Sequence, residues 1–185
     1  MAMSVPRKSL GCSALNPRRE AGDFYVKIIL ILTMVEHYTE AVVLDKEGSG
    51  DFDSKVFLYC KNLGKVVAKA TSARKIISKL SSHLEPGNLI QVRLVQSASW
   101  RITIADALKI SHLPKRQSTF KTLGLVKELS AEGQPDLELW HLLKNGELNG
   151  EKVLRVLGFD LEFAACQSCG AEDPAHFLLN ELEYY

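Results

Sequence analysis

The chain has 185 residues, of which 46% are hydrophobic and 24% are charged, and its formal net charge is +1. This composition is ordinary for a globular protein of one or two compact domains. The longest apolar run, Ile28–Leu32, is too short for a membrane-spanning helix. Two of the four cysteines are isolated, which excludes a disulfide framework, so we expect a reducing, cytoplasmic compartment.

The charge is distributed unevenly along the chain. Residues 34–121 carry fourteen Lys and Arg against eight Asp and Glu, whereas residues 122–185 carry four against twelve. A basic middle followed by an acidic end predicts surfaces that meet different partners.

Residues 1–33 show no periodic pattern and are interpreted as an N-terminal extension. They form either a disordered tail that ends in an edge strand or a segment upstream of the natural start at Met34. We favour the second interpretation, because a clear strand pattern begins just after Met34.

Alternating apolar and polar residues predict five strands within residues 34–113. These strands are Thr39–Leu44, Lys55–Cys60, Gly64–Ala70, Leu89–Val95 and Trp100–Ile104. In the last strand, Trp100 is expected on the same face as Ile102 and Ile104. A helical spacing over Ser72–Leu84 separates the third strand from the fourth. Three strands, a helix and two strands are the order of an OB-fold, a β-barrel that often binds oligonucleotides.

The pattern becomes helical after Pro114. Apolar residues at helical spacing predict short helices over Phe120–Leu129, Pro135–Lys144 and Glu151–Leu157. We therefore predict an α+β protein, with an N-terminal five-stranded OB-fold β-barrel over residues 34–113 and a small helical domain over residues 114–163.

Basic residues dominate the segment between Ser54 and Leu84, which contains no acidic residue. Such a cluster on a barrel can follow a phosphate backbone without recognising its sequence, although a solvated charged face is the plainer interpretation. The predicted nucleic-acid-binding residues are Lys55, Lys61, Lys65, Lys69, Arg74, Lys75, Lys79 and Arg101. Phe57 and Tyr59 point away from the predicted core, so they either stack on bases or pack beneath the helices.

A C-x-x-C pair, Cys166 and Cys169, is followed by Gly170. This spacing supplies half of a structural zinc site, and His176 is the one later histidine that could add a ligand. The alternative is a pair of unligated thiols. We predict an incomplete zinc-ribbon-like segment over residues 164–185, with zinc bound only in an intact, longer protein.

The motifs that mark common catalytic sites do not occur in the sequence. The chain has no P-loop, no G-x-S-x-G, no glycine-rich dinucleotide motif and no metalloprotease histidine pair. We therefore expect that the protein is not an enzyme.

Several stretches in this order resemble the RecO family of bacterial DNA repair and recombination mediators. The matching stretches are Glu40–Leu44, Leu63–Lys75, Ser78–Pro86, Trp100–Ala105, Val153–Phe159 and Cys166–Gly170. The resemblance covers roughly residues 36–170. It implies an OB-fold, a helical domain and, in many members, a zinc ribbon near the end. Residues 1–33 have no counterpart in the family, and a second C-x-x-C would fall beyond Tyr185.

The resemblance also implies a function. Members bind single- and double-stranded DNA without ATP and anneal complementary strands. They act with RecR and single-stranded-DNA-binding protein in loading the recombinase, which implies a place in the cytoplasm near the nucleoid. The alternative is an OB-fold adaptor that binds RNA or protein and has no role in repair. The basic cluster fits the adaptor equally well, but the order of the family motifs does not.

Overall fold

The computed structural model describes residues 34–49, 53–71, 80–172, 177–179 and 181–184. The chain divides into two units, of which the first is Met1–Met34 and the second, Val35–Tyr185, is compact. The predicted N-terminal extension, residues 1–33, lies outside the described residues. All the elements reported below belong to the second unit.

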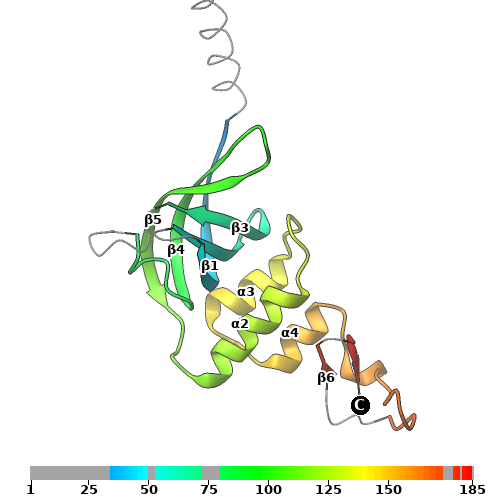
Figure 1. Cartoon of the computed structure of the whole chain (residues 1–185). Coiled ribbons are helices and arrows are strands. Elements are labelled where there is room, and N and C mark those ends of the chain that lie inside the picture. Colours follow the sequence, from blue (N-terminus) through cyan, green and yellow to red (C-terminus); the bar gives the residue numbers. More distant parts are fainter. Residues whose placement is uncertain (1–33, 50–52, 72–79, 173–176, 180, 185) are drawn as a thin grey trace, which may run out of the picture. The chain divides into compact units, whose positions relative to one another are not determined.

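Five strands form a closed barrel in the order β1-β2-β3-β5-β4 (Figure 1). The strands are β1 (Val35–Ser49), β2 (Asp53–Cys60), β3 (Gly64–Ala70), β4 (Asn88–Gln96) and β5 (Ile102–His112). Neighbouring strands are antiparallel, apart from a short parallel pairing of β3 with β5. Hairpins connect β1 with β2, β2 with β3, and β4 with β5, and the long β1 also pairs with β4. The pairing of β3 with β5 is the remaining one and closes the barrel.

The long strand β1 pairs with two partners. Its first half, Val35–Val42, pairs with β4, and its second half, Ala41–Ser49, pairs with β2. The register with β2 shifts between Val43 and Asp45, which is a β-bulge, and such bulges bend a strand enough to pass from one side of a barrel to the other.

The interior of the barrel is one continuous apolar core. Alternate residues of each strand point into it, which is the pattern that the strand period of two requires. Val56, Leu58 and Cys60 of β2 are completely buried there, as the alternation in the sequence predicts. The core also contains Ala41, Val43, Val66, Ala68, Ala70, Leu84, Ile90, Val92, Leu94, Ile104 and Ala107.

Three helices in the described region follow the barrel: α2 (Gln117–Leu129), α3 (Leu137–Asn145) and α4 (Gly150–Val156). The Asp136 side chain accepts a hydrogen bond from the Leu139 N–H at 2.8 Å and so caps the start of α3. Gly146, with a φ of 73°, ends the same helix in the left-handed conformation that suits glycine. The 3₁₀ helix η1 (Leu161–Phe163) and the two-residue strands β6 (Phe177–Leu178) and β7 (Glu183–Tyr184) complete the described elements.

A second core lies between the outer face of the barrel and the helices. The strands β1 and β2 contribute outward-facing apolar residues, and the helices cover them with their own apolar faces. Trp140 of α3 is its largest buried side chain, with 1% of its surface exposed. The members are Val42, Leu44, Phe57, Tyr59, Leu89, Leu113, Leu123, Val126, Leu139, Trp140, Leu143 and Val153.

Polar contacts fix the helices on the barrel. The Tyr59 hydroxyl accepts a hydrogen bond from the Asp136 N–H at 3.0 Å. The Lys127 ammonium of α2 forms ion pairs with Asp45 at 2.8 Å and Glu47 at 2.7 Å, both on β1. The hydrogen bonds that the Lys127 ammonium donates to these carboxylates raise its pKa above the ordinary value for lysine, so they favour the charged form that makes the ion pairs.

The predicted strands and late helices occur in the structure, with different bounds. Strand β1 extends beyond the predicted Thr39–Leu44 at both ends, and α2 begins before the predicted Phe120. Strand β5 begins at Ile102 and continues to His112, so it starts later and runs farther than the sequence pattern predicts. Of the predicted helix Ser72–Leu84, residues 72–79 lie outside the described residues and residues 80–84 form turns. None of the described helices is long and apolar enough to cross a membrane.

Gly64, at the turn between β2 and β3, allows a close approach of the linker between α2 and α3 to the barrel. Its φ is +67°, and an added Cβ would lie 2.1 Å from the carbonyl oxygen of Gln134. We predict that Gly64→Ala lowers the free energy of unfolding by about 2–4 kcal/mol, because it combines left-handed backbone strain with a clash against the main chain. The melting temperature should fall by about 5–15 °C.

Gly124→Ala is the matched control for this substitution. Gly124 lies inside α2, and an added Cβ would meet nothing within 4 Å. The same chemical change should therefore stabilise the protein by about 0.5–1 kcal/mol. Equal melting temperatures for Gly64→Ala and the unmodified protein would contradict the close contact.

Candidate nucleic-acid interface

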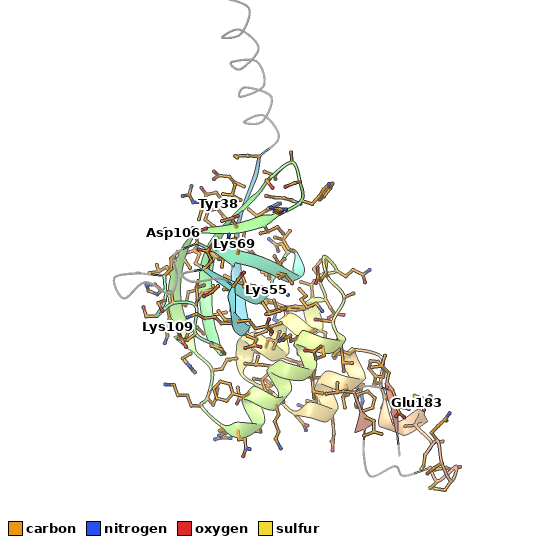
Figure 2. All side chains as sticks on the ribbon, viewed as in Figure 1. Tyr38, Lys55, Lys69, Asp106, Lys109 and Glu183 are labelled. Carbon is orange, nitrogen blue, oxygen red and sulfur yellow. The ribbon has the colours of Figure 1, made fainter. Side chains whose placement is uncertain are left out.

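Three exposed basic residues lie close together on the outside of the barrel. Lys55 of β2 and Lys69 of β3 are cross-strand partners and face outward (Figure 2). Lys69 is in turn opposite Thr103 at the start of β5, which brings Arg101 to the same region. The closure of the barrel therefore gathers cations from positions as far apart as 55 and 101.

These cations line a surface hollow of about 260 Å³. Strands β3 and β5 and the loop between β4 and β5 contribute most of its lining residues. The lining residues are Ser49, Lys55, Val67, Ala68, Lys69, Trp100, Arg101, Ile102 and Thr103. In the described part of the chain, Asp53 is the acidic residue that meets this cluster, through an ion pair with Lys69 at 2.7 Å.

Trp100 stands between this hollow and a second one. The second hollow, of about 380 Å³, shares Val67, Trp100 and Ile102 with the first. Its other lining residues are His37, Asn62, Leu63, Lys65, Val66, Gln96, Glu132 and Gly133. The two hollows are therefore neighbours, and Trp100 lines both of them.

The charge of the first hollow depends on ion pairs made elsewhere. Glu47 is the cross-strand neighbour of Lys55, but its carboxylate is bound to Lys127. The Lys55 ammonium lies 4.7 Å from the centre of the Phe57 ring, a cation–π contact that leaves its positive charge in place. A phosphate group entering the hollow would therefore meet Lys55 and Arg101 without displacing a carboxylate that the described residues pair with them.

The other predicted basic residues are placed differently. Lys61 is exposed in the turn between β2 and β3. Lys65 is half-buried, and its ammonium donates a hydrogen bond to the Lys127 carbonyl at the end of α2, at 2.9 Å. Lys65 thus caps a helix C-terminus, a role that the sequence pattern did not reveal. Arg74, Lys75 and Lys79 lie outside the described residues.

The structure contradicts base stacking on Phe57 and Tyr59. Phe57 is 8% exposed and Tyr59 is 1% exposed, because both rings belong to the core beneath the helices. Burial also raises the pKa of the Tyr59 phenol. Neither ring has a free face, so the alternative interpretation, packing beneath the helices, is the correct one.

The exposed aromatic residue of this surface is Trp100, which the sequence pattern assigned to the wrong place. The strand begins only at Ile102, and Trp100 lies in the preceding loop with 83% of its surface exposed. The turn-forming run Ser97–Ser99 just before it was the available signal, because such residues mark a loop rather than a strand.

Cys166 and Cys169 occupy a tight turn. The Gly170 N–H donates to the Cys166 carbonyl and the Cys166 N–H to the Ala171 carbonyl, both at 2.8 Å. A hydrogen bond with the Ser168 hydroxyl, at 3.2 Å, is the main cause that lowers the pKa of the Cys166 thiol to about 7. Among the described residues, no group of three or more His, Cys, Asp or Glu could hold a metal ion, and the candidate ligand His176 lies outside these residues.

Comparison with known proteins identifies two similar sequences. The chain is 30% identical over 167 residues to the DNA repair protein RecO of Symbiobacterium thermophilum, covering 75% of this chain and 63% of that protein. It is 26% identical over 153 residues to the DNA repair protein RecO of Alkaliphilus metalliredigens, covering 71% of this chain and 62% of that protein. The chain thus spans less than two thirds of the length of either relative. No protein-family model matches the chain.

We predict that this chain does not retain zinc. Two thiolates leave two positions of a tetrahedral ion to be filled by water or weak ligands, so a chelator should remove the metal readily. The measurement is metal content after purification in the presence of a modest chelator. One zinc ion retained per chain would contradict the prediction, and loss of that zinc in His176→Ala would then identify the missing ligand.

Proposed function

We propose, from its similarity to two RecO proteins, that this chain is a member of the RecO family and acts in DNA repair by binding DNA through its barrel. The observation that carries the proposal is the hollow lined by Lys55, Lys69 and Arg101. Clustered cations on an otherwise mixed surface attract a phosphate backbone, because each neutralised phosphate releases condensed counterions.

We propose further that the barrel is an OB-fold. The strand order β1-β2-β3-β5-β4 and the parallel pairing of β3 with β5 support this assignment. OB-folds bind oligonucleotides on the face of strands 2 and 3 and with the loops that flank it, including the loop between strands 4 and 5. The hollow on β2, β3 and the β4–β5 loop occupies the corresponding place.

The finer parts of the proposal come from the family. In it, the chain is a non-catalytic recombination mediator near the nucleoid that binds single- and double-stranded DNA without ATP and anneals complementary strands. RecR and single-stranded-DNA-binding protein are its proposed partners in loading the recombinase. The helices α2–α4 and the acidic end of the chain are the proposed surfaces for such partners.

The proposal predicts that binding depends on salt through the residues of the hollow. In Lys55→Gln with Arg101→Gln, two phosphate contacts are lost without unpairing a carboxylate of the part of the chain that the structure describes. A plot of log K against log salt for a single-stranded oligonucleotide should therefore become shallower by about 1.4, since each contact contributes about 0.7. Fluorescence anisotropy of a labelled oligonucleotide at several salt concentrations measures both affinity and slope.

The matched control is Lys109→Gln with Lys121→Gln. These two lysines are exposed and lie on β5 and α2, outside the lining of the hollow, and the net charge changes by the same amount. An equal loss of affinity and slope in both double variants would mean that general charge, rather than this hollow, determines binding. Absence of DNA binding by the unmodified chain at low salt would refute the proposed function.

A further inference from the structure

The loop between β4 and β5 is a tight hairpin that holds Trp100 out in solvent. The Ser97 N–H donates to the Arg101 carbonyl at 3.0 Å and the Trp100 N–H to the Ser97 carbonyl at 2.9 Å. The Ser97 hydroxyl also donates to the Arg101 carbonyl, at 3.2 Å. This network fixes the loop, which joins the two strands at the tip of the green hairpin at the top of Figure 1. The exposed Trp100 ring is therefore carried by a hydrogen-bonded turn.

The backbone of Trp100 is in an unfavourable conformation for its side chain. Its φ is 60°, in the left-handed region that large residues rarely adopt. In a hairpin loop of three residues, the last position requires this conformation and usually holds glycine. Here a tryptophan occupies this position. Its side chain is 83% exposed, so packing contacts do not offset the cost of the backbone conformation. Such conformations concentrate at sites that bind ligands.

The surroundings of Trp100 identify the class of ligand. Trp100 lines the first hollow together with Lys55, Lys69 and Arg101, and it lines the second hollow together with polar residues that include Asn62 and Gln96. An exposed aromatic ring beside aligned cations provides a stacking face and a path for phosphates. A duplex hides the faces of its bases within its stack, whereas a single strand can offer them to the ring.

We propose that Trp100 stacks on an unpaired base of a single nucleic-acid strand whose phosphates lie against Lys55, Lys69 and Arg101. This proposal rests on the function proposed above, and it adds the residue that makes binding depend on the presence of bases. The cations hold the backbone and the indole ring recognises that a base is present, without distinguishing which base it is.

A comparison of two oligonucleotides tests this assignment on the full chain. One is a single-stranded DNA oligonucleotide, and the other has the same length and phosphates but abasic sites throughout its centre. The unmodified chain should bind the base-containing strand between about 5-fold and about 150-fold more tightly, the range expected for one stacked base. In Trp100→Gly this preference should disappear, while affinity for the abasic strand stays the same.

Intrinsic fluorescence provides an independent measurement. The chain has two tryptophans, and Trp140 is buried with 1% of its surface exposed. Quenching by the base-containing strand should therefore come from Trp100 and be lost in Trp100→Phe. Phenylalanine still offers a ring, so Trp100→Phe should keep most of the affinity for that strand. Phe163→Ala, which removes a ring that is 88% exposed outside both hollows, is the matched control and should change neither result.

Glycine is chosen because the fold should tolerate it. The φ of 60° suits glycine, so the melting temperature of Trp100→Gly should equal or exceed that of the unmodified chain. Equal binding of both oligonucleotides by the unmodified chain, without quenching, would overturn the role of Trp100 and leave the proposed function intact. Binding of neither oligonucleotide would refute the proposed function and the stacking role together.

Discussion

The apolar outer face of β1 and β2 is the constraint on which the arrangement of this molecule depends. A small barrel usually turns polar residues outward, but here Leu44, Phe57 and Tyr59 point away from the barrel interior and require a cover. The helices α2–α4 provide that cover and build a second core. The helices therefore cover one part of the barrel exterior and leave another part exposed to solvent. Lys55 of β2 and Lys69 of β3 lie in the exposed part.

The same packing determines which charges remain available to a ligand. The acidic half of the chain contributes lysines as well, and two of them reach back to β1: Lys127 binds Asp45 and Glu47, and Lys144 binds Glu40 at 2.7 Å. These ion pairs neutralise carboxylates of the barrel. Contacts between the basic middle and the acidic end of the chain therefore neutralise part of the charge of each. One of these carboxylates, Glu47, is the cross-strand neighbour of Lys55, so its pairing with Lys127 favours a positive potential at the hollow.

Local patterns in the sequence predicted the strands, the inward faces of β2 and β4 and the late helices, because strand and helix periods follow directly from residue order. They also placed Phe57 and Tyr59 on the outer face. Whether an outer face is free or covered depends on helices about eighty residues away, which is why the same residues suggested stacking. The contact of Lys65 with the end of α2 was not predicted for the same reason, since the carbonyl that it caps lies 62 positions along the chain. Trp100 was missed because alternation continued through it, while the hairpin hydrogen bonds ended the strand pattern at Ile102.

The contact at Gly64 has a consequence for how the protein unfolds. The turn between β2 and β3 and the linker between α2 and α3 touch main chain to main chain, and the Gly133 N–H donates to the Lys65 carbonyl at 3.0 Å beside them. Barrel and helices share this contact and a common core, so neither can lose its structure without exposing apolar surface of the other. We therefore expect the barrel and helices to melt in a single cooperative transition, with calorimetric and van't Hoff enthalpies that agree.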